Sequence, residues 1–229
     1  NAMQSATDVR LPTATTSARE TGARTTQDRT MQAAPTTAQE TIECRMRQVT
    51  HRIQRVGYAV LDHAVRRADA DALRASLADL HAAGSLRAHR FGFKKRPEDR
   101  RHELFVKPHT VEAELDDLRT RNLAADVDAR LAAINLPAAA AAAFPCLRLS
   151  SAAAAAATVK LQYNEGDGGC FPLHFDNAGG ACKRKLTAIL YLNPGWADGD
   201  GGELELVPWL EPAVRIAPAH GRRVLFRSE

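Results

Sequence analysis

The sequence predicts an α+β fold in which helices come first and a strand-rich core follows. From about Glu40 to Ile134, apolar side chains mostly recur at helical spacing. After Thr158 the pattern changes to short alternating segments, separated by clusters of Gly, Pro, Asn and Asp, which is typical of a barrel or sandwich. Because the helices precede the strands, we expect them to pack on the outside of a sheet.

The length and composition are those of a globular protein with one sizeable core, or with one core and a tail. Hydrophobic residues make up 45% of the 229 residues, charged residues make up 25%, and the formal net charge is +4. So small a charge does not indicate a nucleic-acid partner, and no apolar run approaches the roughly 20 residues of a membrane span. The sequence therefore predicts neither nucleic-acid nor membrane binding, and it leaves the oligomeric state open.

The four cysteines are widely spaced and form no zinc-binding motif: Cys44, Cys146, Cys170 and Cys182. We therefore expect reduced thiols in an intracellular protein, either cytoplasmic or nuclear. Cys170 and Cys182 flank the turn that contains His174-Phe175-Asp176, and a disulfide between them is the alternative.

Residues 1–39 are expected to form a disordered, low-complexity tail. Asn1-Ala2 before Met3 resembles the remnant of an expression tag. The segment is rich in Thr, Ala, Arg and Gln and lacks apolar periodicity, so it cannot bury enough surface to offset the entropy of ordering it. Its frequent Arg and Thr and its few acids also fit a transit peptide, which would target the protein to an organelle.

We expect three helices within residues 40–157, which we assign to the support of the domain. Each carries apolar residues at helical spacing and ends at a residue that stops helices, namely Gly57, Gly84 or Pro137. The expected spans are 40–56, 66–83 with Asp69 or Asp71 as N-cap, and 110–135, and a short strand is expected at 58–62.

Two further stretches of this region have a biased composition. Residues 87–107 are basic and interleaved with phenylalanines, for which we expect a solvated face over buried rings. A surface for nucleic acid or an acidic peptide is the alternative. The alanine runs 138–143 and 152–157 favour short helical turns.

The core, residues 158–229, contains the stretch on which the functional prediction rests. Strands are expected at 159–164, 186–192, 203–207 and 223–227. The first leads through a glycine-rich turn to His174-Phe175-Asp176. Residues two apart in an extended segment point to the same side, so His174 and Asp176 should project together. An imidazole beside a carboxylate makes two thirds of the facial triad that binds non-haem Fe(II).

Together these motifs resemble the 2-oxoglutarate- and Fe(II)-dependent dioxygenases, and within them the prolyl-hydroxylase group. The matching residues are Tyr163-Asn164, Gly166, His174 to Asn177, Leu186 to Asn193, Trp196, Gly201 to Leu204, Pro218 and Gly221 to Phe226. The resemblance implies a double-stranded β-helix core, of the jelly-roll or cupin-like kind, within a domain that spans residues 40–229.

The resemblance also implies roles by position. His174 and Asp176 would bind the iron, and Tyr191 would donate its hydroxyl to a carboxylate of 2-oxoglutarate. Thr187 would line the same pocket, and Tyr163 would sit over the cofactor. For either tyrosine, a place in the core is the alternative.

As to activity, the resemblance implies hydroxylation of a peptide or protein side chain, with proline as the expected target. The cofactors would be Fe(II) and 2-oxoglutarate, dioxygen would be the co-substrate, and ascorbate is compatible as an auxiliary reductant. The basic loop 177–185 would contact the substrate or be only a hairpin. Two alternatives stay open: a non-catalytic β-barrel binding module, and a related hydroxylase of a small molecule.

The sequence departs from the family pattern at its end. In the family, a second metal-binding His and a basic residue for 2-oxoglutarate follow the last strand, but the sequence stops at Glu229. His220 is interpreted as a loop residue and not as a replacement ligand. We therefore expect either a longer native chain that supplies both groups or an incomplete site with weak hold on iron and 2-oxoglutarate.

Overall fold

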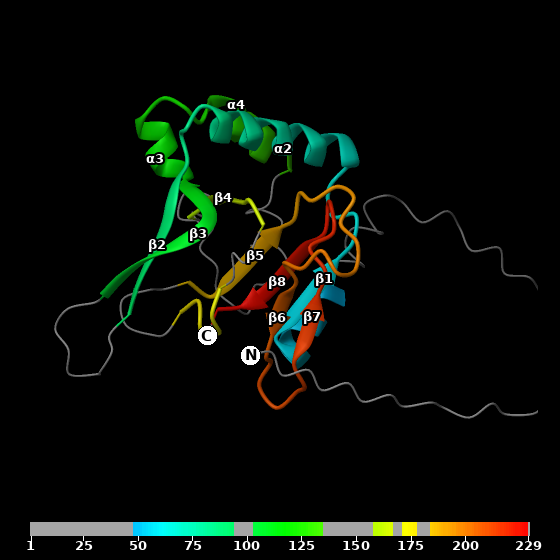
Figure 1. The fold of residues 1–229 in the computed structure, drawn as a ribbon. Coiled ribbons are helices and arrows are strands. Elements are labelled where there is room, and N and C mark those ends of the chain that lie inside the picture. Colours follow the sequence, from blue (N-terminus) through cyan, green and yellow to red (C-terminus); the bar gives the residue numbers. More distant parts are fainter. Residues whose placement is uncertain (1–47, 94–102, 135–157, 167–170, 178–183, 229) are drawn as a thin grey trace, which may run out of the picture. The chain divides into compact units, whose positions relative to one another are not determined.

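The computed structural model describes residues 48–93, 103–134, 158–166, 171–177 and 184–228 (Figure 1). All of these residues belong to one compact unit. The predictions for the tail, the alanine runs and the four cysteines lie outside the described residues. Within those residues, no helix is both long enough and apolar enough to span a bilayer.

The described strands form three antiparallel sheets beside several helices, so the fold has mixed α and β content. The first sheet has the order β1-β8-β5, the second β2-β3-β4, and β6 and β7 form a hairpin (Figure 1). The strands are β1 (Tyr58–Leu61), β2 (Arg87–Phe93), β3 (Glu103–Glu114), β4 (Lys160–Asn164), β5 (Leu186–Leu190), β6 (Leu204–Leu206), β7 (Val214–Ile216) and β8 (Arg223–Arg227).

The two faces of the first sheet have different surroundings. Leu186 of β5, Leu225 of β8 and Ala59 of β1 share one face and pack in a cluster with Val49 and Ile53. The latter two belong to the helical residues 48–56. Because side chains alternate along a strand, Thr187 and Phe226 lie on the opposite face. The helix therefore covers one face, and the other carries the residues predicted for the site.

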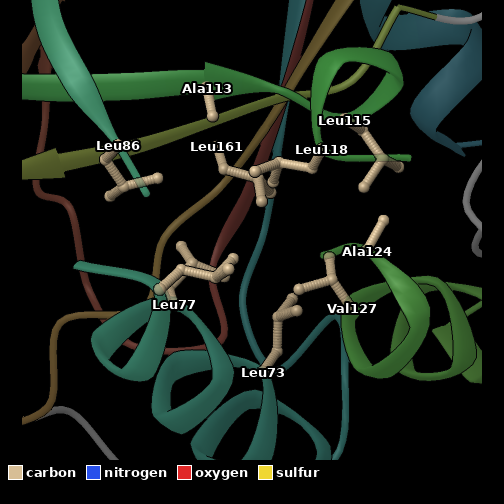
Figure 2. Close-up of a cluster of buried hydrophobic side chains, with 10 residues drawn as sticks. Leu73, Leu77, Leu86, Ala113, Leu115, Leu118, Ala124, Val127 and Leu161 are labelled. Carbon is tan, nitrogen blue, oxygen red and sulfur yellow. The ribbon is translucent and has the colours of Figure 1, made fainter. Parts of the chain in front are cut away.

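The larger core lies between the second sheet and three helices. These are α2 (Arg67–Ala82), α3 (Leu115–Thr120) and α4 (Ala125–Ile134). Figure 2 shows leucines of α2 meeting residues of β3, β4, α3 and α4. The buried members are Leu73, Leu77, Leu80, Leu86, Ala113, Leu115, Leu118, Ala124, Val127 and Leu161. Apolar residues at helical spacing on α2 thus provide one side of this core.

Helix α2 occupies the span where 66–83 was predicted, but its start differs in detail. The N-cap is Arg66, not Asp69 or Asp71, and Asp69 lies in the first turn, where it accepts hydrogen bonds from Arg66. A carboxylate in the first turn still stabilises the helix, because it interacts favourably with the positive end of the helix dipole. At the other end Gly84 has a φ of +66°, and its N–H donates to His81 O, as expected for a helix stop.

The prediction of one helix over 110–135 is wrong at its start. Thr110 to Glu114 form the end of β3, and two shorter helices, α3 and α4, follow. Val111 pairs with Ala88 on one side and with Tyr163 on the other. Ladder hydrogen bonds on both sides, together with β-branched side chains, favour the strand over the helix that the leucine spacing indicated.

The boundary at residue 158 also separates helices from strands less cleanly than predicted. Strands β1, β2 and β3 precede it, and of these only β1 was expected. β2 and β3 lie in the basic stretch 87–107 and just after it, where charge obscured their alternation. Strands β4, β5, β6 and β8 occur where predicted, β8 with the same ends and the others with ends shifted by at most two residues, whereas the three-residue β7 was missed.

Candidate active site

His174 and Asp176 lie side by side in the segment 171–177, which follows β4. His174 Nε2 is 3.3 Å from Asp176 Oδ1. The segment is not part of a sheet, yet the two side chains meet, as their spacing indicates. The His174 side chain is 53% exposed and that of Asp176 is 18% exposed. The pair therefore opens to solvent on the imidazole side and is anchored on the carboxylate side.

A backbone carbonyl fixes the protonation pattern of the neutral imidazole. His174 Nδ1 is 2.7 Å from Pro172 O. A carbonyl oxygen only accepts hydrogen bonds, so Nδ1 carries the proton. Nε2 of the neutral ring then presents a lone pair toward Asp176, and this is the form in which imidazole binds a metal.

The two carboxylate oxygens of Asp176 have different surroundings. Oδ2 accepts a hydrogen bond of 2.5 Å from Thr187 Oγ1, and the Arg184 guanidinium lies 3.7 Å from the same oxygen. Arg184 also donates to the backbone oxygen of Asp176 at 3.0 Å. Oδ1 is the oxygen turned toward His174. One oxygen is thus held by the protein while the other faces the imidazole.

The residue after Asp176 fastens the segment to the first sheet. The backbone N–H of Asn177 donates to Ser228 O at 2.8 Å, just beyond the end of β8. Its side-chain Nδ2 donates to Arg184 O at 2.9 Å, just before β5. Both Asn177 and Ser228 are buried. These bonds set the position of Asp176 relative to β5 and β8.

The donor pair fits a metal ion of the kind the sequence predicts. Two ligand atoms that each lie about 2.1 Å from one ion, at right angles, are about 3 Å apart. The 3.3 Å between Nε2 and Oδ1 is close to this value. An imidazole nitrogen with a carboxylate oxygen is the donor combination of non-haem Fe(II) sites. Within the described residues, no group of three or more His, Cys, Asp or Glu side chains is arranged so that it could hold a metal ion.

Tyr191 directly follows β5, and the alternation of side chains along that strand would place it on the same face as Thr187. Its backbone continues the pairing of β5 with β8, because its N–H donates to Arg222 O and its carbonyl accepts from Gly221 N, each at 2.9 Å. Four residues of strand separate it from Thr187 by about 13 Å. Burial raises the pKa of Tyr191 to about 12, and the positive charge of Arg222 opposes part of this rise. The phenol therefore stays protonated at neutral pH and can donate a hydrogen bond.

Tyr163 occupies a different setting, in β4 of the second sheet. Its ring stacks on that of His81 of α2, with centroids 4.3 Å apart and planes 16° from parallel. It also packs against the larger core cluster. These contacts are those of a partly buried core residue, and its predicted place over the cofactor stays a prediction.

Phe171 connects the site to the second sheet and was not predicted as part of it. Lys107 Nζ of β3 lies 3.0 Å from the centroid of its ring, and the ring of His89 of β2 lies 5.1 Å away at 59°. The centroid of the His174 ring is 6.4 Å from that of Phe171. Lys107 and His89 are both buried. A cation over an aromatic face is attractive, so this contact draws the start of the segment toward β2 and β3.

Comparison with known proteins shows what the core is similar to. Residues 159–229 match the family model of the 2OG-Fe(II) oxygenase superfamily, where 2OG is 2-oxoglutarate. No sequence in a search of curated proteins matches the chain. Among solved structures, a prolyl 4-hydroxylase from Phytophthora capsici is 32% identical, with a TM-score of 0.64. That match covers 86% of this chain and 60% of the other, so the chain spans less than two thirds of its relative's length.

Two more distant structures share the fold. A Pseudomonas putida prolyl-4-hydroxylase is 22% identical over 80% of this chain and 86% of its own, with a TM-score of 0.56. A Trichoplax adhaerens prolyl hydroxylase, solved with a peptide of hypoxia inducible factor, is 18% identical over 83% and 81%, with a TM-score of 0.57. Residues 159–229 are therefore similar to the 2OG-Fe(II) oxygenase superfamily, and the chain resembles prolyl hydroxylases in sequence and fold.

Proposed function

We propose that the protein is an Fe(II)- and 2-oxoglutarate-dependent dioxygenase that hydroxylates proline in a peptide or protein. The observation that carries the proposal is the pair His174 Nε2 and Asp176 Oδ1, 3.3 Å apart within the segment that matches the superfamily. The similarity to a prolyl 4-hydroxylase of Phytophthora capsici supports proline as the target.

The proposal includes the architecture around this pair. The antiparallel sheets and the fold shared with prolyl hydroxylases support a double-stranded β-helix core with supporting helices, in a domain of residues 40–229. Residues 1–39 are proposed as a disordered tail, because they are rich in Thr, Ala, Arg and Gln and their apolar residues show no periodicity. We also propose an intracellular setting, which the widely spaced cysteines support.

The residues of the chain would act by holding and orienting the reactants. When bound, Fe(II) and 2-oxoglutarate supply an oxidation in which dioxygen converts 2-oxoglutarate to succinate and CO₂ and hydroxylates a substrate C–H bond. His174 Nε2 and Asp176 Oδ1 would hold the metal. The protonated hydroxyl of Tyr191 would donate to a carboxylate of 2-oxoglutarate, and Thr187 and Tyr163 would border the same cofactor.

The surface beside His174 favours a large substrate over a small molecule. Phe171, Leu173 and Phe175 are exposed by 43%, 80% and 77%, although they are large apolar side chains. Exposed apolar groups that gather at one place mark a contact surface. Leu173 and Phe175 lie directly before and after His174, and Phe171 lies three residues before it, so a peptide could pack against them while one residue approaches the metal.

The test is hydroxylation of defined peptides by the full-length protein. It is supplied with Fe(II), 2-oxoglutarate and ascorbate, and with peptides that contain one proline or alanine in its place. We expect the proline peptides alone to gain one oxygen atom by mass spectrometry. Uptake of oxygen by the alanine peptides would contradict proline as the target. Tight peptide binding without any turnover would instead support a non-catalytic binding module, and turnover of a small molecule alone would support the other alternative.

A further inference from the structure

The hydroxyl of Thr187 is engaged by two partners, and chemistry fixes the direction of each bond. Thr187 Oγ1 lies 2.5 Å from Asp176 Oδ2 and 2.9 Å from Ser228 Oγ. An ionised carboxylate only accepts hydrogen bonds, so the single proton of Thr187 goes to Asp176. The Thr187 oxygen must then accept the proton of Ser228. The two hydroxyls form a relay that runs from Ser228 through Thr187 to Asp176.

Both hydroxyls of this relay are held in place by their surroundings. Ser228 is only 2% exposed, its N–H donates to Lys185 O at 3.2 Å, and its carbonyl accepts from Asn177 N at 2.8 Å. Thr187 lies within β5, paired with Phe226, and its β-branched side chain has few rotamers. Neither oxygen can turn away without breaking a partly buried hydrogen bond.

Asp176 needs such a constraint, because the terminal torsion of an aspartate is soft and nearly two-fold. Without a fixed donor, rotation would exchange Oδ1 and Oδ2 in front of His174. The charge of Arg184, 3.7 Å from Oδ2, would also compete for whichever oxygen came near. The bond from Thr187 therefore decides which oxygen faces the imidazole.

We propose that Thr187 and Ser228 are positioning residues that hold Asp176 Oδ1 toward His174 and so set the metal affinity of the pair. This inference rests on the proposed function and differs from the role first predicted for Thr187, which was to line the cofactor pocket. A hydroxyl that holds a metal-binding carboxylate acts before 2-oxoglutarate arrives. Its removal should therefore weaken metal binding in the absence of any co-substrate.

The experiment is a titration of the full-length protein with Mn(II), without 2-oxoglutarate, followed by calorimetry. Thr187→Val keeps the shape of the side chain and removes the donor, so we expect an affinity about 10- to 100-fold lower, the usual cost of losing such a support. Thr187→Ser restores the hydroxyl and should stay within about threefold of the wild type. Ser228→Ala leaves the bond from Thr187 to Asp176 intact and should cost less than Thr187→Val.

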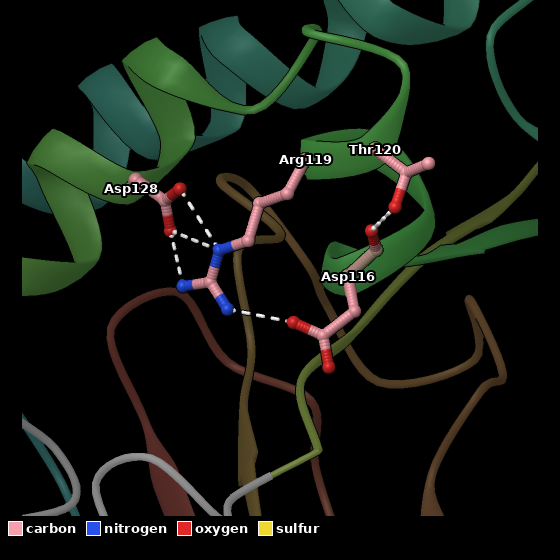
Figure 3. Close-up of polar contacts among 4 residues, drawn as sticks. All are labelled: Asp116, Arg119, Thr120 and Asp128. Atoms are coloured by element: carbon pink, nitrogen blue, oxygen red, sulfur yellow. Dashed lines mark hydrogen bonds and ion pairs between the residues drawn. The ribbon is translucent and has the colours of Figure 1, made fainter.

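A matched control removes a threonine hydroxyl elsewhere. Thr120 Oγ1 of α3 donates to the backbone oxygen of Asp116 at 2.9 Å (Figure 3). Thr120→Val should leave the Mn(II) affinity unchanged. The melting temperature of each metal-free variant separates a loss of position from a loss of folding, and if Thr187→Val fails to fold, Thr187→Ser and Ser228→Ala still decide.

The outcomes distinguish this proposal from the one on which it rests. Wild-type affinity in Thr187→Val would overturn the positioning role and leave the proposed function standing. Equal weakening by Thr187→Ser and Thr187→Val would also overturn it, because the hydroxyl would then not be the cause. A wild-type protein that binds no Mn(II) would overturn both.

Discussion

At the scale of single residues, the candidate site depends on short contacts made by donors and acceptors of fixed type. The Pro172 carbonyl determines which nitrogen of His174 is protonated, and Thr187 determines which oxygen of Asp176 is engaged. The Pro172 carbonyl and the Asp176 carboxylate can only accept hydrogen bonds, so the protons must lie on His174 Nδ1 and Thr187 Oγ1. The metal-binding atoms, Nε2 and Oδ1, are those left facing each other.

Tyr191→Phe tests the predicted contact with 2-oxoglutarate. Burial raises the pKa of Tyr191 to about 12, so at neutral pH the wild-type phenol is a donor. A hydrogen bond to a charged group contributes about 1.5–3 kcal/mol. The dissociation constant for 2-oxoglutarate should therefore rise about 10- to 100-fold, while Mn(II) affinity stays unchanged. Tyr58→Phe, on β1, is the matched control, and an unchanged constant in Tyr191→Phe would exclude the contact.

The sequence could predict the pairing of His174 with Asp176, because the alternation of two residues is a local property. It could not predict the partners of the pair. Thr187 and Ser228 are 41 positions apart, and Lys107 of β3 reaches Phe171 from a distant part of the chain. Such contacts depend on how the sheets pair, which no local spacing encodes.

At the scale of elements, an ion pair joins α3 to α4, the two helices that were predicted from the sequence as one. Arg119 of α3 contacts Asp128 of α4 through Nε and Nη2, the shortest distance being 2.6 Å, and its Nη1 donates to Asp116 at 2.7 Å (Figure 3). The sequence predicted a single helix here because leucines recur at helical spacing through the break. Asn122, with a φ of +57°, marks the turn between α3 and α4.

Arg119→Met tests this connection through its dependence on pH. The hydrogen bond from Arg119 lowers the pKa of Asp128 below its usual value of 3.8. A carboxylate whose pKa is lower in the folded state stabilises the fold above its unfolded pKa, and this contribution is lost as the pH falls through the folded pKa. The variant should melt at a lower temperature than the wild type at pH 7, and the difference should shrink below about pH 4.

Thermal melts of both proteins at several pH values provide the measurement. Because these side chains are largely exposed, the difference should be small and should decrease in high salt. A difference that is constant from neutral to acid pH would show that Arg119 acts through packing alone.

At the scale of the whole described unit, two cores support the site from different sides. The cluster of Val49, Ile53, Ala59 and Leu225 lies behind the first sheet, and the larger cluster in Figure 2 lies behind the second. Asp176 is tied to the first sheet through Thr187, and Phe171 is tied to the second through Lys107. The segment 171–177 is thus held from both sheets, so core packing should influence the position of both metal-binding side chains.

Leu118→Ala tests the larger core. Leu118 is fully buried, and shortening a buried leucine costs about 2–5 kcal/mol in the free energy of unfolding. Leu123→Ala, nearby but at a position 39% exposed, should cost less than about 1 kcal/mol. Urea denaturation of the two variants and the wild type gives these values. Equal losses in both variants would contradict the position assigned to this cluster.

The central claim is that His174 and Asp176 form a working iron site, and succinate production tests it most directly. The full-length protein is given Fe(II), 2-oxoglutarate and a proline peptide, and succinate is measured for the wild type, His174→Ala and His51→Ala. His51 is an exposed residue of the helical segment 48–56, so its loss controls for removal of a histidine as such. We predict that the wild type and His51→Ala form succinate at similar rates, whereas His174→Ala forms almost none, because it lacks a metal-binding nitrogen. Succinate formation by His174→Ala at the wild-type rate would contradict the claim.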